Sequence, residues 1–379
     1  MNNDLSKISF ENVIEDDSER KLYEKIASDI LVYLKNNGPT SFNVLNKYVG
    51  GSDRRTLRLL DEMVRNRVIL FENNMFMTPD YNSTTLSANN FICNSCNGRI
   101  AVGSGSFENI IEEARVILAS RPRPTFVFDQ RPVTFETTIS RVAYAIWRND
   151  IRNMRMAILG DDDLTSIPLA LTRLPLEVVV FEIDKRLVTF INNIAKQYKL
   201  RLKALQCDLT KPISTKYHNY FDVFMCDPTP TRIPFTIFVN QGIELLIKDK
   251  GVGYVSMYSS CLDKNLDLQV VLNNMRVLIT DMIPYFTDYA YVKETYSEND
   301  IRLLNKYSSG VSHISFNESL VRFEVTHLTK NVSIRFSQKD ILGKATKRIM
   351  KNPSKDPAIA LGSEVDRVYL LSALRKVEK

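Results

Sequence analysis

The sequence is poor in several residue types on which common kinds of site depend. It has three histidines, which lie far apart and in unlike contexts: His218, His313 and His327. A histidine-rich metal site or a cysteine–histidine protease is therefore not expected. Its five cysteines are an odd number and lie mostly in apolar runs, which argues against the disulfide framework of a secreted protein.

Long apolar segments are missing as well. No run approaches the roughly 20 apolar residues that cross a bilayer, and the first residues lack the basic and apolar segments of a secretion signal. We therefore expect a cytoplasmic protein with no membrane partner. The length of 379 residues predicts two or three domains. The excess of 50 Lys and Arg over 44 Asp and Glu is too small to require a nucleic-acid partner by itself.

Residues 1–82 have the pattern of a winged helix-turn-helix domain. Apolar positions at helical spacing, followed by two short apolar strands, predict three helices and a hairpin: 20–36, 41–48, 53–67 and 68–77.

The third of these helices is rich in arginine: Arg54, Arg55, Arg58, Arg65 and Arg67. Two interpretations stay open. It is a DNA-recognition helix, or it is a solvated basic face on a domain that serves dimerisation or substrate gating. Nucleic acid therefore stays open as a partner, and we expect a homodimer.

Residues 83–150 are expected to connect this domain to the next. Their first part is rich in Ser, Asn and Gly and contains the pair Cys93-x-x-Cys96. One such pair is half of a tetrahedral zinc site, so structural zinc is not expected unless a dimer shares the four thiolates. Beyond it we expect helices over 107–120 and 134–149 and a short strand over 125–128.

Residues 151–335 alternate between strands and helices. The predicted strands are five: 155–160, 177–183, 202–207, 222–226 and 253–257. This alternation predicts a doubly wound α/β domain, and two later strands favour its methyltransferase-type version: those near 285–293 and 320–328. The expected fold class is thus α/β, with a winged-helix domain followed by a Rossmann-like catalytic domain and a basic tail over 336–379.

The predicted strands of this domain end in acidic residues. Three aspartates follow Gly160 at the end of the first strand, and acids follow the next three: Asp161, Asp162, Asp163, Glu182, Asp184, Asp208 and Asp227. Because ligands of open α/β sheets bind at the carboxyl ends of the strands, we expect these carboxylates to meet in one crevice. Asp184, with Glu182 as second choice, is placed to bind ribose hydroxyls. Asp208 is placed to bind an adenine amino group, and Asp227 lies where the transferred group would meet its acceptor.

The loop after the first strand differs from a phosphate-binding loop. A dinucleotide site uses several glycines to bring backbone amides to pyrophosphate, whereas this loop has Gly160 followed by three aspartates. Such a loop repels phosphate and suits the carboxylate of S-adenosylmethionine badly. It suits decarboxylated S-adenosylmethionine, whose tail ends in an ammonium group. Helix capping explains one aspartate, but three together need a cation, either a metal or a polyamine.

The loop and its neighbours resemble a known family. The run Leu159-Gly160-Asp161-Asp162-Asp163-Leu164-Thr165-Ser166 is similar to the Gly-Asp-Asp-Asp signature of archaeal and bacterial branched-chain polyamine synthases, the N(4)-bis(aminopropyl)spermidine synthases. Weaker similarities occur at several further places: Cys93-x-x-Cys96-x-Gly98-Arg99, Arg121-Pro122, Phe128-Asp129-Gln130, Glu182-Ile183-Asp184-x-Arg186-Leu187 and Asp227-Pro228. The resemblance covers most of residues 20–300, and it implies the same winged-helix front domain.

One departure from the family pattern lies at the end of the fourth strand. The family typically has Asp-Pro-Pro there, followed by a glutamate or another residue and then Thr, whereas this chain has Asp227-Pro228-Thr229-Pro230-Thr231. The aspartate and the final threonine are kept, so Asp227, Pro228 and Thr231 are the expected substrate-binding residues. The change between them leaves the preferred polyamine open.

The resemblance implies an aminopropyltransferase. Such enzymes move an aminopropyl group from decarboxylated S-adenosylmethionine to the internal secondary amine of spermidine, and branched polyamines and methylthioadenosine result. The sulfonium carbon is already electrophilic, so we expect no cofactor beyond this co-substrate. A carboxylate must take the proton of the attacking amine; we expect Asp162 or Asp163, with Asp161 orienting the loop. Gly160, Glu182, Asp184 and Asp208 form the expected donor site.

Two other functions stay open. An S-adenosylmethionine-dependent nucleic-acid methyltransferase would use Asp-Pro-Pro followed by an aromatic residue that stacks on a flipped base. Here no aromatic residue follows Asp227 before Phe235. A winged-helix regulator would bind duplex DNA through the arginines of the third helix, but it has little use for so many acids at strand ends.

Overall fold

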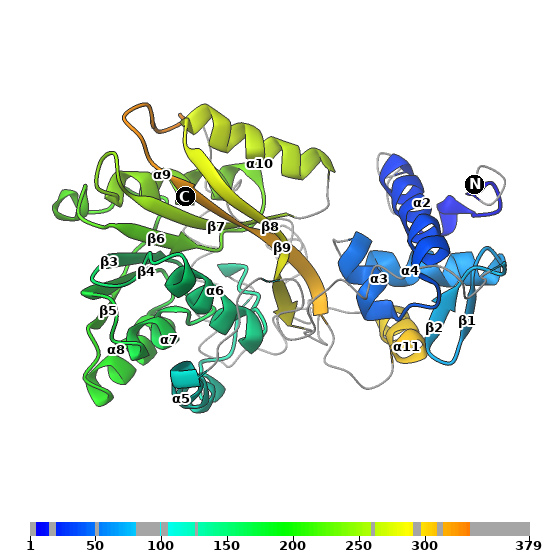
Figure 1. Cartoon of the computed structure of the whole chain (residues 1–379), viewed down its shortest axis with the longest axis horizontal. Coiled ribbons are helices and arrows are strands. Elements are labelled where there is room, and N and C mark those ends of the chain that lie inside the picture. The colour runs from blue at the N-terminus through cyan, green and yellow to red at the C-terminus, as the bar shows by residue number, and fades with distance from the viewer. Residues whose placement is uncertain are drawn as a thin grey trace, which may run out of the picture. The chain divides into compact units, whose positions relative to one another are not determined.

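The computed structural model describes residues 5–14, 20–49, 53–80, 99, 105–125, 128–258, 262–290, 297–308 and 314–333 (Figure 1). The chain divides into two compact units. Unit 1 comprises residues 1–98, 258–261 and 288–318, and unit 2 comprises residues 99–257, 262–287 and 319–379. The Cys93–Cys96 pair and the tail over 336–379 lie outside the described residues.

Unit 1 contains the helices and the hairpin that we expected near the N-terminus. They are α2 (Arg20–Asn37), α3 (Phe42–Val49), α4 (Asp53–Arg65), β1 (Leu70–Glu72) and β2 (Met75–Met77), preceded by the short turn η1 (Phe10–Asn12). The two strands pair antiparallel. The apolar faces of these elements form one core.

A further helix, α11 (Glu298–Tyr307), completes this core and was not predicted. Its N-terminus is a capping box, in which Ser297 and Asp300 each bond the other's backbone N–H. Leu303, Leu304 and Tyr307 pack into the core of unit 1. The capping-box residues can be recognised in the sequence. That the helix packs against residues more than 200 positions earlier cannot be predicted from local patterns.

Unit 2 contains a seven-stranded sheet in the order β5-β4-β3-β6-β7-β9-β8. The strands are β3 (Arg155–Leu159), β4 (Glu177–Glu182), β5 (Leu202–Gln206), β6 (Val223–Cys226), β7 (Val252–Tyr258), β8 (Leu278–Ala290) and β9 (Ile314–Glu324). The pairs β3–β4, β4–β5, β3–β6 and β6–β7 are parallel. This is the mostly parallel sheet of a methyltransferase-type Rossmann domain, as expected from the sequence.

Helices cover both faces of this sheet. They are α5 (Glu108–Ala119), α6 (Phe135–Trp147), α7 (Ser166–Leu171), α8 (Lys185–Gln197), α9 (Arg232–Leu245) and α10 (Leu262–Met275), and α5 is preceded by the turn η4 (Gly105–Phe107). Of the strand expected over 125–128, Thr125 and Phe128 do not lie in a strand, and residues 126–127 lie outside the described residues.

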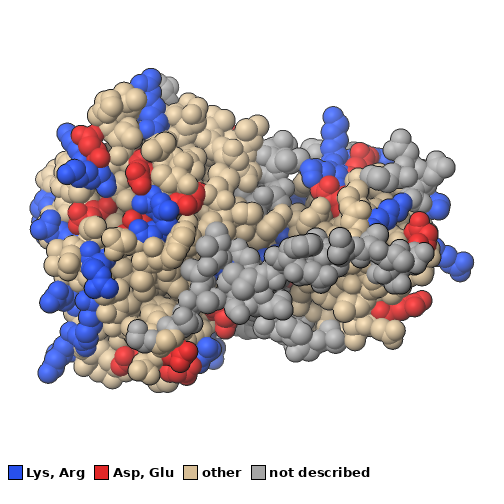
Figure 2. Space-filling model, in the orientation of Figure 1, with Lys and Arg blue, Asp and Glu red and all other residues tan. Residues whose placement is uncertain are grey.

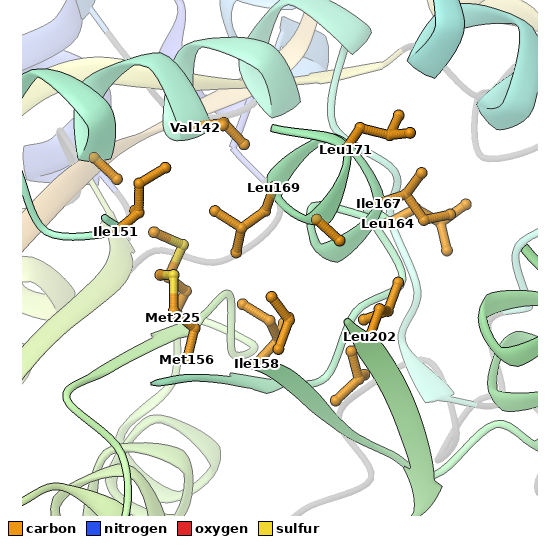
Figure 3. Packing of buried hydrophobic residues seen from close by; sticks show 14 of the residues in the cluster. Val142, Ile151, Met156, Ile158, Leu164, Ile167, Leu169, Leu171, Leu202 and Met225 are labelled. Atoms are coloured by element: carbon orange, nitrogen blue, oxygen red, sulfur yellow. The ribbon is translucent and has the colours of Figure 1, made fainter. Parts of the chain in front are cut away.

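The core of unit 2 consists of two apolar layers, one on each face of the sheet. Met156 and Ile158 of β3 pack into the layer under α5 to α8, and Ala157 and Leu159 pack into the layer under α9 and α10. Side chains alternate between faces along a strand, so one short strand serves both layers. Figure 3 shows the first layer, in which Val142 of α6 faces the strands.

A buried ion pair links β9 to the chain segment after α6. Arg322 and Asp150 are 4% and 7% exposed. The guanidinium donates to both carboxylate oxygens, Nε to Oδ2 at 2.7 Å and Nη2 to Oδ1 at 3.1 Å. The hydroxyl of Tyr254 on β7 donates to the same carboxylate. The pair therefore joins three segments that are distant in sequence.

We predict that Arg322→Met lowers the free energy of unfolding by about 3–5 kcal/mol, because it leaves the Asp150 carboxylate buried without its cation. The matched control is Arg20→Met, whose pairs with Glu11 and Glu24 are exposed to solvent and therefore contribute little to stability. Urea unfolding of both variants measures the difference. Equal losses in the two variants would contradict the prediction.

Candidate active site

The loop after β3 turns at Gly160 and is held from β4. Gly160 has a φ of +68°, a left-handed conformation that glycine adopts freely, and an added Cβ would lie 3.2 Å from the Phe238 ring. The next residue, Asp161, donates its backbone N–H to Glu182 Oε2 at 2.7 Å. The other Glu182 oxygen accepts the N–H of Asp184 at 2.8 Å. Glu182 thus fixes the backbone of the loop after β3 and of the loop after β4.

Arg141 of α6 lies between the aspartates of two strand ends. Its Nη1 donates to Asp163 Oδ2 at 2.7 Å, and its Nη2 donates to Asp227 Oδ2 at 2.5 Å. The three side chains are at most 10% exposed. Nη2 also reaches Ser256 Oγ of β7 at 3.0 Å and Thr287 Oγ1 of β8 at 3.3 Å. One cation therefore connects the ends of four strands to α6.

Our sequence analysis missed Arg141. The signal was present, because Arg141 stands among buried apolar residues of a predicted helix, between Ile139 and Val142. A cation in such a position needs an acidic partner. The sequence does not say which of the many acids that partner is.

These residues line one pocket at the carboxyl ends of the strands. Among the expected site residues, Gly160, Asp161, Asp163 and Asp227 face it. Arg141, Thr165, Tyr254 and Ser256 line it as well. Asp161 Oδ2 and Thr165 Oγ1 are buried without a hydrogen-bond partner among the described residues. The pocket thus presents polar oxygen atoms that a ligand can use.

The structure does not place the remaining expected residues in the lining of this pocket. Asp184 caps α8 and accepts bonds from Arg186 and from Gln130 Nε2 at 3.1 Å. Asp208 accepts the N–H and the hydroxyl of Thr210 within its own turn. Two residues of the expected substrate site lie beyond Asp227: Pro228 is buried, and Thr231 is exposed at the start of α9.

Asp162 lies between the pocket residues and has fewer contacts. It is half-buried, and Oδ2 accepts the backbone N–H of Arg131 at 3.2 Å. The guanidinium of Arg121 donates to its backbone carbonyl. Asp163 is more constrained, because Oδ1 accepts the N–H of Val133 at 3.0 Å while Arg141 holds Oδ2.

The aspartates of the loop hold their protons more tightly than ordinary aspartates. Burial, together with the Glu182 and Asp163 carboxylates, raises the pKa of Asp161 to about 8. Burial raises the pKa of Asp163 to about 6, with Arg141 opposing the rise. The pKa of Asp162 lies well above its ordinary value, because of burial and the nearby carboxylates of Asp163, Glu182 and Asp227.

The pKa values of the acids outside the pocket shift in both directions. Burial raises the pKa of Glu182 above its ordinary value. Although burial alone would raise the pKa of Asp184, the bonds from Arg186 and Gln130 hold it below the ordinary value. The pKa of Asp208 is likewise lowered, since Thr210 and Lys211 outweigh the effect of burial.

Fold and site together define a class of protein: a Rossmann-type protein of the methyltransferase topology whose pocket is acidic where a phosphate-binding loop would be basic or glycine-rich. Residues 109–342 match the family profile described as the branched-chain polyamine synthase A C-terminal domain. The match covers more than half of the chain, and the chain therefore belongs to this family.

Two relatives in sequence agree with this assignment. An N(4)-bis(aminopropyl)spermidine synthase of Methanocaldococcus jannaschii is 38% identical over 213 residues, which are 54% of this chain and 61% of the relative. One of Thermococcus kodakarensis is 38% identical over 212 residues, which are 54% of this chain and 60% of the relative. The matches thus span about three-fifths of these relatives.

A crystal structure of the branched-chain polyamine synthase from Thermus thermophilus, in complex with N4-aminopropylspermidine and 5'-methylthioadenosine, has the same fold. Its TM-score is 0.70 at 23% sequence identity, and the comparison covers 90% of this chain and 98% of that chain.

The part of the chain that the structure describes contains no group of three or more His, Cys, Asp or Glu side chains that could hold a metal ion. None of the described helices is both long and apolar enough to span a bilayer.

We predict that Asp161→Asn raises the melting temperature more at about pH 8 than at about pH 5. The folded chain keeps the Asp161 proton between the ordinary pKa and about 8, whereas the unfolded chain loses it, so the wild type loses stability as the pH rises through this window. The control Asp208→Asn should lower the melting temperature at about pH 8. The pKa of Asp208 is lowered in the fold, so its ionised form stabilises the fold above the ordinary pKa. Thermal melts at the two pH values test both. A lower melting temperature for Asp161→Asn at pH 8 would contradict the prediction.

Proposed function

We propose that this chain transfers an aminopropyl group from decarboxylated S-adenosylmethionine to the internal secondary amine of spermidine. The products are a branched polyamine and methylthioadenosine. The observation that carries the proposal is the pocket of Asp161, Asp163 and Asp227 beside Asp162, where carboxylates outnumber the one buried arginine between them. Such a surplus of negative charge favours a ligand with several ammonium groups. The names of the two relatives support the same reaction.

In this reaction the amine nitrogen forms a bond to the aminopropyl carbon while the carbon–sulfur bond breaks. The internal amine of spermidine is mostly protonated near neutral pH, so its proton must leave before the nitrogen can attack. The base must therefore be a carboxylate whose pKa has been raised towards neutrality. Asp162 and Asp163 both meet this condition.

Their contacts favour Asp162 as the base. Both oxygens of Asp163 are engaged, by Val133 and Arg141, which suits a group that orients the loop and binds an ammonium group. Asp162 is half-buried and accepts one weak bond from Arg131. It can turn an oxygen towards the amine without breaking an ion pair. Asp161 would then shape the loop through its backbone bond to Glu182.

The donor and acceptor would occupy opposite sides of this loop. In the proposal, Gly160 lets the donor approach the backbone, Glu182 holds the loop, and Asp184 and Asp208 bind the nucleoside. Asp184 and Asp208 already accept hydrogen bonds from residues of their own turns. A bound nucleoside would replace these bonds or share the carboxylates with them. Asp227, Pro228 and Thr231 would lie on the polyamine side.

The alternative functions have less support. The methyltransferase needs a loop that tolerates the carboxylate of S-adenosylmethionine, and three aspartates repel it. The regulator needs free arginines on α4, but Arg58 donates to both oxygens of the buried Asp300 on α11, at 2.8 and 3.0 Å. Arg65 is paired with Asp61.

The domain plan and the assembly belong to the same proposal. We infer that unit 1 is a winged-helix domain with α11 added, that 83–150 connects it to the catalytic part, and that the protein is a cytoplasmic homodimer. Exposed apolar side chains on α10 and on the sheet edge β8 favour association: Leu266, Val270, Leu278 and Met282. A molar mass of 43.5 kDa in solution would contradict the dimer.

We predict that the protein, incubated with spermidine and decarboxylated S-adenosylmethionine, forms methylthioadenosine and a polyamine heavier by one or two aminopropyl groups. Ordinary S-adenosylmethionine should give no product, because its carboxylate meets the aspartate loop. Chromatography of polyamines and nucleosides measures both. Methyl transfer from the ordinary donor would favour the methyltransferase instead.

We predict that Asp162→Asn lowers kcat by at least 100-fold, the lower range for loss of a general base, and leaves the melting temperature within a few degrees of the wild type. Asp163→Asn should also lose most turnover, but with a lower melting temperature because its bond to Arg141 weakens. Asp249→Asn, an exposed acid remote from the loop in sequence, is the control and should keep full turnover. Full activity of both loop variants would remove these residues from the mechanism.

A further inference from the structure

The edge of the unit 2 sheet opposite the aspartate loop carries exposed cations. By this edge we mean the side of the sheet on which its parallel strands begin. They end on the opposite side, where the aspartate loop lies. Arg152 precedes β3, Arg173 precedes β4, and Lys199 and Arg201 precede β5. All four side chains are exposed. We call these four residues the basic edge.

Hydrogen bonds place the turns that carry the basic edge side by side. The Arg173 guanidinium donates to the carbonyl of Tyr198 at 3.2 Å and to that of Lys199 at 3.5 Å. The turn of Arg152 is joined to that of Arg173, because the N–H of Asn153 donates to Leu174 at 2.9 Å. Lys and Arg side chains gather on this side of unit 2 in Figure 2, where Figure 1 shows α8 and β5.

No member of the basic edge has an ion-pair partner within the ranges that the structure describes. Other cations of unit 2 do: Arg141, Arg186 and Arg322 each bind a buried aspartate. Glu177 is the acid that the register places nearest, and Lys203 binds it at 2.6 Å. Four cations on adjacent turns repel one another, and an anionic partner would relieve this repulsion.

We propose that the basic edge binds the phosphodiester backbone of nucleic acid. Neighbouring strands lie about 5 Å apart, so cations at their beginnings can meet several phosphates of one duplex, which carries a charge every ~3.4 Å along each strand. Three of the four are arginines, whose planar guanidinium groups suit phosphate. The proposal does not depend on the reaction that the pocket catalyses.

The surroundings of the basic edge favour nucleic acid over a lipid surface. Proteins that lie on membranes insert apolar side chains beside their cations. Of the large apolar side chains in these turns, Leu176 is the exposed one. The surface is otherwise polar, as the surface of a backbone-binding protein is.

The test uses the full chain and a short fluorescent DNA duplex, with binding followed by anisotropy in a buffer without polyamines. If four phosphates are contacted, raising the salt from about 50 to 200 mM should weaken binding about 100-fold. In the triple variant Arg152→Gln, Lys199→Gln, Arg201→Gln, the same change of salt should weaken binding by only about 3- to 4-fold. Arg173 is kept, because its guanidinium holds two turns together.

The control is a second triple variant with the same loss of charge elsewhere on unit 2: Lys185→Gln, Arg276→Gln, Lys330→Gln. It should bind like the wild type. Equal weakening in both triple variants would show a response to net charge alone and overturn the proposal. So would a loss confined to Arg54→Gln, Arg55→Gln on α4, no duplex binding, or binding of phosphatidylserine vesicles in place of DNA.

Discussion

The geometry of the pocket depends on the two ion pairs that Arg141 makes with Asp163 and Asp227. Buried charges lose their hydration, and they are tolerated only when opposite charges and hydrogen bonds replace it. Arg141 supplies one positive charge between two carboxylates, while its further bonds to Ser256 and Thr287 fix its own position. A residue of α6 thereby determines where the ends of β3 and β6 lie, and the remaining carboxylates stay available for a cationic ligand.

This arrangement explains why the loop aspartates differ from one another. Asp163 has a counter-ion, and its pKa rises only to about 6. The Asp161 carboxylate accepts the backbone N–H of Ser166 but has no counter-ion among the described residues, and its pKa rises to about 8. A polyamine would supply the missing positive charge, and its binding would favour the ionised form of these groups. The acids that help to hold the loops, Glu182 and Asp184, are instead occupied by backbone N–H groups and by Arg186.

The two ends of the parallel strands carry opposite charges, because acids and cations stand at opposite ends of the strands in the sequence. The acids of the candidate site end or follow strands, and the cations of the basic edge precede strands. Unit 1 uses its charges differently. The arginines Arg58 and Arg65 of α4, which the sequence left open to DNA, form ion pairs with Asp300 and Asp61 inside the same unit.

The sequence by itself determined the α/β class, the helices α2, α3 and α4 of unit 1, the order of strands and helices in unit 2 and the aspartate loop after β3. These depend on apolar periodicity and on residues that are neighbours in the chain, and both can be read locally. The tertiary structure decided what depends on contacts between distant residues. It placed α11 in the core of unit 1, brought Arg141 between Asp163 and Asp227, and left Asp184 and Asp208 outside the pocket lining. Spacing along the chain shows that an acid follows a strand; the partner that the acid meets depends on packing between elements far apart in sequence.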